Sequence, residues 1–199
     1  MQPFSVYVEF DTADASPDTY EALYDALLDK HGAVGPAPNG NVSVRLTVHA
    51  HSVLEAASLG IEHAQAAAIP HGITPDTVIG TEVVTENERD RRLLEDQDDG
   101  PSAEVQRGQD GEPAFSVYVE FARADAPLDI YEALYDALLD KHGAVGPAPN
   151  GNVSVRLTVH AHSVFEAASL GIEYAQAAAI PHGITPDTVI GTEVMVTSS

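Results

Sequence analysis

The stretch NVSVRLTVHAHS occupies residues 41–52 and recurs without a change at residues 152–163. Its apolar residues alternate with polar ones, the pattern of a strand with one buried face. The Asn39-Gly40 pair before it is typical of a hairpin turn. Ser52 and Glu55 after it have the spacing of a capping box, which predicts a helix running to about Ala68. One short stretch therefore predicts a hairpin, a strand and the start of a helix.

The repeat extends far beyond this stretch. Phe4–Val83 (copy one) aligns without a gap with Phe115–Val194 (copy two), and only seven positions differ. They are Asp11/Ala122, Thr12/Arg123, Ser16/Pro127, Pro17/Leu128, Thr19/Ile130, Leu54/Phe165 and His63/Tyr174. Such near-identity indicates recent duplication or deliberate construction. Each copy is large enough to fold by itself.

The residues between the copies have a different composition. Residues 85–113 are rich in charge, Gly, Pro and Gln and carry few apolar side chains. Such a segment buries too little surface to offset its ordering entropy, although Glu88–Asp96 can form a transient helix. We therefore predict a domain at 1–84, an acidic flexible linker at 85–113 and a second domain at 114–199.

The order of elements in one copy predicts the fold class. FSVYVEF (Phe4–Phe10) alternates as a strand, Pro17–His31 has helical spacing and ends before Gly32, and residues 32–38 form a short edge strand. A last strand is expected at Thr77–Val83. The order β-α-β-β-α-β predicts an α+β protein of two tandem ferredoxin-like domains, with the helices on one face of each sheet.

The other face of each sheet, the open face, carries polar and aromatic side chains. Because neighbouring strands share faces, Glu9 and Arg45 are a candidate ion pair across the strands, of a kind that contributes little when exposed. Two identical open faces on one chain predict a pseudo-dimer packed sheet to sheet, with the two repeats pairing intramolecularly. The expected interface residues are Tyr7, Glu9, Arg45, Thr47 and His49, with Tyr118, Glu120, Arg156, Thr158 and His160 in copy two.

The histidines offer an alternative. His49 and His51 lie on the same side of a strand, and the topology places His31 at the same end of the sheet. Three imidazoles can bind a divalent transition metal, although surface histidines of this kind are more often ordinary polar residues. The candidate ligands are His31, His49 and His51, with His142, His160 and His162 in copy two.

Sequence motifs of catalysis are scarce. The chain has no phosphate-binding glycine loop, no Gly-x-Ser-x-Gly and no cysteine. An enzyme with its site in a cavity between two sheets would use His49 as acid or base, beside Tyr7 and Glu9. The sequence favours a non-enzymatic protein-interaction or regulatory module, with a metal- or small-molecule-binding protein as the alternative.

The charge limits the partners. The 31 Asp and Glu against 9 Lys and Arg give a net charge of −22, which opposes contact with a phosphate backbone. No apolar run is long enough to span a bilayer, and MQPFSVYVEF does not have the pattern of a signal peptide. We therefore expect a cytoplasmic protein that binds another protein and no nucleic acid or membrane.

The stretch NGNVSVRLTVHAHSVLEAASLGIEHAQAA (residues 39–67), followed by a strand and TENERDRRLLE, resembles the N-terminal domain of small actinobacterial proteins of largely uncharacterised function. Many of those proteins continue into a helix-turn-helix that binds DNA. No helix-turn-helix pattern follows Glu95 here. The resemblance therefore implies a regulatory or dimerising domain without its DNA-binding segment.

Overall fold

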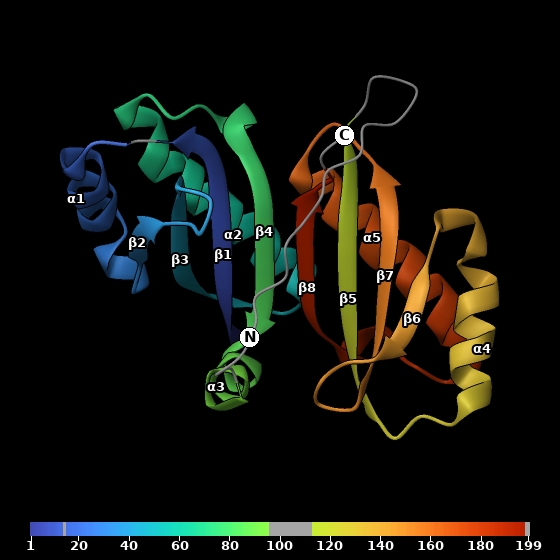
Figure 1. The fold of residues 1–199 in the computed structure, drawn as a ribbon. Coiled ribbons are helices and arrows are strands. Elements are labelled where there is room, and N and C mark those ends of the chain that lie inside the picture. Colours follow the sequence, from blue (N-terminus) through green and yellow to red (C-terminus); the bar gives the residue numbers. More distant parts are fainter. Residues whose placement is uncertain (14, 96–112, 198–199) are drawn as a thin grey trace. The chain divides into compact units, whose positions relative to one another are not determined.

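The computed structural model describes residues 1–13, 15–95 and 113–197. The chain divides into two compact units, Met1–Leu93 and Leu94–Ser199. Each unit is a mixed α+β structure in which an antiparallel sheet is covered by helices (Figure 1).

The first unit contains the elements that the repeat predicts and one more helix. Its strands are β1 (Gln2–Ala13), β2 (Ala33–Pro36), β3 (Asn41–Ala50) and β4 (Val78–Thr85). Its helices are α1 (Pro17–Ala26), α2 (Val53–Ala68) and α3 (Glu86–Glu95). The prediction of a helix from Ser52 to about Ala68 is confirmed, since the Ser52 hydroxyl caps α2 by accepting from the Glu55 N–H at 3.1 Å.

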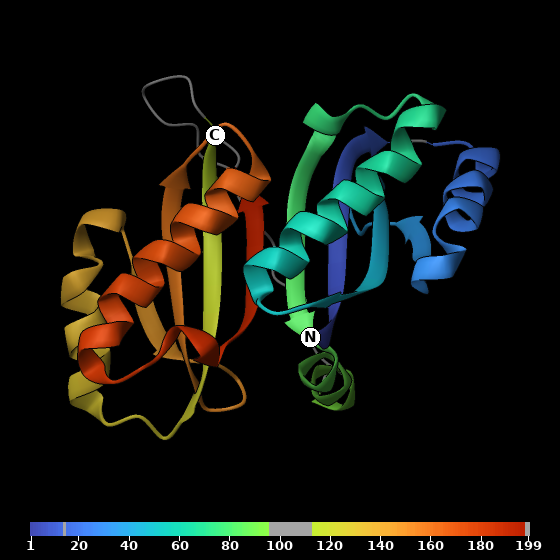
Figure 2. The same ribbon diagram turned by 180° about the vertical axis from the view of Figure 1, so that it is seen from behind.

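Within this unit the strands lie in the order β2-β3-β1-β4, and each is antiparallel to its neighbours. The first and third strands are therefore central, as expected. Figure 2 shows α2 crossing one face of the sheet, and α1 lies beside β2 and contacts α2. Side chains facing α2, such as Val6, Val8 and Leu46, are almost completely buried.

The second unit repeats this arrangement, with the order β6-β7-β5-β8. Its strands are β5 (Ala114–Ala124), β6 (Ala144–Pro147), β7 (Asn152–His160) and β8 (Val189–Val196). Its helices are α4 (Leu128–Ala137) and α5 (Val164–Ala179). The match between the two units follows directly from their near-identical sequences.

The first helix is shorter than predicted. The prediction ran from Pro17 to His31, but α1 ends at Ala26 and continues as a 3-10 turn over Leu28–Lys30. His31 then adopts a left-handed backbone with φ 51°, and the N–H of Gly32 donates to the carbonyl of Leu27 at 3.0 Å. The tighter turn returns the chain to β2, which begins only two residues after His31.

The segment predicted as a linker begins with a helix. The Thr85 hydroxyl accepts from the Glu88 N–H at 3.2 Å, so Thr85 and Glu88 start α3 as a capping pair. Copy two has Val196 at the position of Thr85, which has no hydroxyl to cap with. The remaining linker residues, 96–112, lie outside the described residues. In the described part of the chain, no helix is both long enough and apolar enough to cross a membrane.

Candidate functional site on the open face of each sheet

The residues predicted for the interface lie on the central strands. In β1 and β3, Tyr7 is directly opposite Arg45, Glu9 opposite Ser43 and Ser5 opposite Thr47. Directly opposed residues of antiparallel strands share a face, and this is the face away from α2. In the second unit, Tyr118 lies opposite Arg156, Glu120 opposite Ser154, Ser116 opposite Thr158 and Ala114 opposite His160.

Arg45 connects three strands of the first unit. Its guanidinium lies 5.2 Å from the centre of the Tyr7 ring, forms an ion pair with Glu82 at 2.9 Å and donates to the Ser5 hydroxyl at 3.2 Å. The strand register explains how Arg45 of β3 contacts both other strands, because Tyr7 of β1 lies directly between Arg45 and Glu82 of β4. The candidate ion pair between Glu9 and Arg45 is therefore wrong.

Glu9 instead holds the hairpin that precedes β3. Its carboxylate is only 6% exposed and accepts from the side-chain amides of Asn39 at 2.6 Å and Asn41 at 3.2 Å. The Tyr7 hydroxyl donates to the same carboxylate at 3.3 Å. The Asn39-Gly40 pair alone predicts only a turn, and the spacing Asn-Gly-Asn beside a strand glutamate is the sequence signal for this contact.

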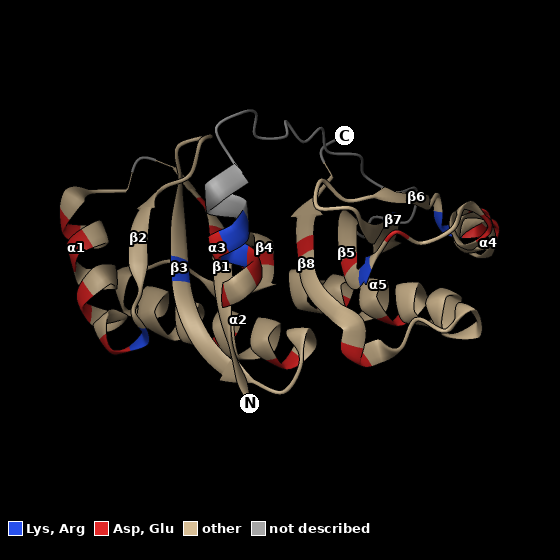
Figure 3. Cartoon of the chain, turned by 90° about the horizontal axis from the view of Figure 1, so that it is seen from below, with Lys and Arg blue, Asp and Glu red and all other residues tan. Residues whose placement is uncertain are grey.

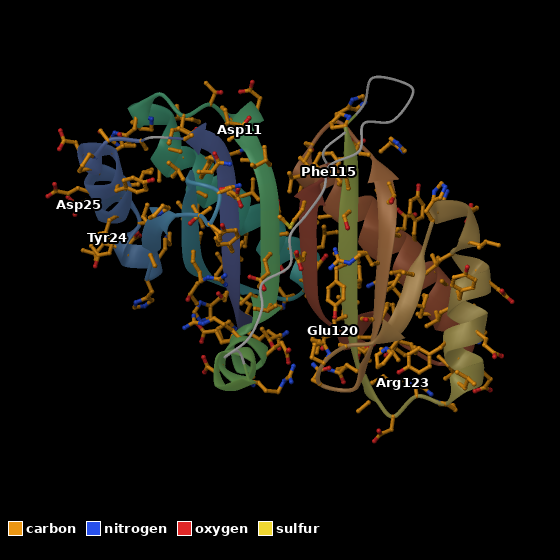
Figure 4. All side chains as sticks on the ribbon, in the orientation of Figure 1. Asp11, Tyr24, Asp25, Phe115, Glu120 and Arg123 are labelled. Carbon is orange, nitrogen blue, oxygen red and sulfur yellow. The ribbon has the colours of Figure 1, made fainter. Side chains whose placement is uncertain are left out.

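The second copy builds the same arrangement. Arg156 lies 5.3 Å from the Tyr118 ring centre and donates to Ser116 at 3.0 Å, while its ion pair with Glu193 is longer, at 4.0 Å. Glu120, labelled in Figure 4, is 1% exposed and accepts from Asn150 and, at 2.8 Å, from Asn152. Each open face thus combines a buried carboxylate that fixes a turn with a half-exposed Tyr–Arg stack.

The Tyr7 hydroxyl titrates at unusually high pH. Burial, followed by the negative charge of Glu9, raises the pKa of Tyr7 from 10.0 to about 12. As the pH rises, this hydroxyl ionises in the unfolded chain before it does so in the folded chain. The free energy of unfolding therefore keeps the full contribution of the neutral Tyr7 hydroxyl below about pH 10 and loses it as the pH rises towards about 12.

We expect the unfolding midpoint of Tyr7→Phe to fall less over this pH interval than that of the unsubstituted chain, with Tyr24→Phe as the matched control. Equal alkaline losses in Tyr7→Phe and the unsubstituted chain would contradict this assignment.

Thr47 and His49 lie towards the end of the sheet where β1 begins. The Thr47 hydroxyl donates to Glu86 of α3 at 3.0 Å, and His49 is exposed at the end of β3. Figure 3 shows α3 on the side of the sheet away from α2. In the first unit, α3 therefore takes up part of the open face near Thr47. The strand pattern around Thr47 carries no signal for this contact.

The histidines do not form a ready metal site. His31 follows the 3-10 turn, His49 ends a strand, and the backbone N–H of His51 donates to Glu55 at 2.6 Å just before α2. His142, His160 and His162 occupy the matching places in copy two. Among the described residues, no group of three or more His, Cys, Asp or Glu side chains is arranged to hold a metal ion.

No known protein family and no curated protein matches the chain. A microcompartment protein from Desulfitobacterium hafniense aligns over 100% of this chain and 97% of its own, with 13% identity and a TM-score of 0.31. The small subunit of acetolactate synthase from Thermotoga maritima aligns over 100% and 99%, with 9% identity and a TM-score of 0.27. Both TM-scores are too low for either likeness to carry an argument about this chain.

Proposed function

We propose that the protein is a non-enzymatic interaction module built from two ferredoxin-like domains on one chain. The order β-α-β-β-α-β, with β1 and β3 central and α2 on one face, supports this assignment for copy one. Copy two has the same order of elements and strands. This pattern leaves the centre of each open face, around Tyr7 and Tyr118, on the side away from α2 and α5, while α3 takes up part of the first face near Thr47.

The observation that carries the proposal is the Tyr–Arg stack in the middle of each open face. Tyr7 and Arg45 form it in copy one, and Tyr118 and Arg156 repeat it at nearly the same spacing in copy two. Tyrosine and arginine are the residue types that most often dominate binding at protein interfaces. The two repeats pair through these faces and form a single-chain pseudo-dimer, which assembles with or regulates another protein.

The polar groups of the open face are suited to packing rather than to chemistry. Arg45 is held by Glu82 and Ser5, and Glu9 is held by Asn39 and Asn41, so these groups already have partners before any contact forms. A side chain fixed in this way loses little further conformational entropy when a second surface covers it. The metal-binding alternative has weaker support, because the candidate histidines are not grouped.

Small-angle scattering of the full chain tests the pairing. We expect Tyr7→Ser with Tyr118→Ser to increase the radius of gyration, because the substitutions remove the aromatic centre of both faces. Tyr24→Ser with Tyr135→Ser is the matched control, since it removes two tyrosines from exposed helix positions. An unchanged radius in the open-face variant, with both variants folded by circular dichroism, would rule out pairing through these residues.

A further inference from the structure

The outer side of α1, with the 3-10 turn after it, exposes two large side chains. Tyr24 is 47% and Leu28 58% exposed, whereas Leu23 and Leu27 on the inner side are 0% and 2% exposed. Figure 4 shows Tyr24 projecting outward from α1. Tyr24 lies in the last turn of α1 and Leu28 lies in the 3-10 turn that follows it, and we call these two exposed side chains the strip.

Acidic side chains lie along one side of this strip. Glu21, Asp25 and Asp29 are all exposed, and Asp25 projects outward beside Tyr24 (Figure 4). Lys30 is the Lys or Arg nearest to these acids in the sequence, and its Nζ lies 3.2 Å from Oδ2 of Asp29. The outer side of α1 and of the turn after it is therefore apolar at Tyr24 and Leu28 and negative along one side of them.

Copy two carries a larger version of the same surface. Tyr135 and Leu139 are 48% and 59% exposed, and Leu128, which replaces Pro17, adds a third apolar side chain that is 72% exposed. Five of the seven differences between the copies lie in residues 11–19 and 122–130, at or just before the start of this helix. The exposed acids beside these side chains in copy two are Asp129, Glu132, Asp136 and Asp140, again along one side.

We propose that α1 and α4 are docking surfaces for a cationic amphipathic helix of a partner protein. The apolar strip matches the apolar side of such a helix, and the acids beside the strip match its Lys and Arg side chains. A second copy of this chain is a poor occupant, because two such surfaces would bring like charges together. The inference goes beyond the proposed function, since it uses the outer helices and not the open faces.

The test uses the full chain and a synthetic helical peptide of Leu and Lys with one apolar side. A scrambled peptide of the same composition carries the same charge without the apolar side. We expect the amphipathic peptide to bind at least about tenfold more tightly in calorimetry, a difference of about 1.4 kcal/mol. Tyr135→Ser with Leu139→Ser is expected to lower the affinity more than Tyr24→Ser with Leu28→Ser, because copy two has the larger strip.

Two further variants test whether peptide binding depends on the apolar strip and on the acids beside it. Ile69→Ser with Ile180→Ser removes isoleucines of similar exposure, 52% and 53%, outside α1 and α4, and should leave binding unchanged. Glu132→Gln with Asp136→Asn keeps the apolar strip and should weaken both binding and its dependence on salt. Equal binding of the scrambled peptide, or unchanged affinity in the Tyr–Leu variants, would overturn the proposal. Because none of these substitutions touches an open face, the result is independent of the pairing test.

Discussion

Replacing Gly60 and Gly171 by alanine is expected to lower the free energy of unfolding by about 2 kcal/mol per copy. Gly60 lies where α2 crosses β1, and a Cβ there would come within 2.7 Å of Val6 Cβ and still closer to Val6 Cγ1. Rotation of the Val6 side chain cannot relieve the contact with its own Cβ. The overpacking cost of about 3 kcal/mol therefore exceeds the gain of about 1 kcal/mol that alanine brings to a helix.

Urea unfolding of the full chain measures this effect. A Cβ at Gly171 would come within 2.8 Å of Val117 Cβ, so the double variant destabilises both units by nearly the same amount. Gly35→Ala is the matched control, because a Cβ at Gly35 would have no atom within 4 Å. Adding Val6→Ala and Val117→Ala should restore part of the lost stability. A double glycine variant as stable as the Gly35→Ala control would show that α2 does not pack this closely on β1.

Removing the buried carboxylates should have an effect of similar size. Glu9→Ala leaves the buried Asn41 amide without its acceptor, and an unpaired buried donor costs about 1–3 kcal/mol, whereas the exposed Asn39 amide can donate to water. We expect Glu9→Ala with Glu120→Ala to lose about 1–3 kcal/mol in urea unfolding, more in copy one than in copy two, where Asn150 and Asn152 are only partly buried. Amide exchange of the β2–β3 and β6–β7 turns should accelerate most, because these turns lose their contact with the central strand.

Glu82→Ala with Glu193→Ala is the matched control for this prediction. It also removes one carboxylate from each sheet, but each carboxylate is 25% exposed and pairs with an arginine. Partly exposed ion pairs contribute about 1 kcal/mol or less. If the control variant lost as much stability as the Glu9 and Glu120 variant, burial of the carboxylate would not be the cause.

Much of each unit could be predicted from the sequence because local patterns determine it. The alternation in FSVYVEF gave a strand, although β1 extends to Ala13, which pairs with Asn41 beyond an irregularity after Phe10. The capping pair of Ser52 and Glu55 located the start of α2. The end of α1 was harder to predict, because it depends on the close approach of Gly32 to Leu27.

The partners of the charged groups could not be predicted as well. The choice between Glu9 and Glu82 for Arg45 depends on the register of β4, which no local pattern encodes. Glu9 could bind the hairpin only because Asn39 and Asn41 return to β1, a tertiary contact. The start of α3 was different, since Thr85 and Glu88 have capping spacing in the sequence itself.

The most direct test of the proposed pairing is the distance between the two outer helical layers. The chain has no cysteine, so Glu62→Cys on α2 and Glu173→Cys on α5 give two unique, exposed sites for spin labels. Pairing of the open faces places both helices outside two sheets about 10 Å apart, so we expect one narrow distance peak at roughly 30 to 40 Å. A broad distribution, or a narrow peak well below this range, would contradict pairing through the open faces.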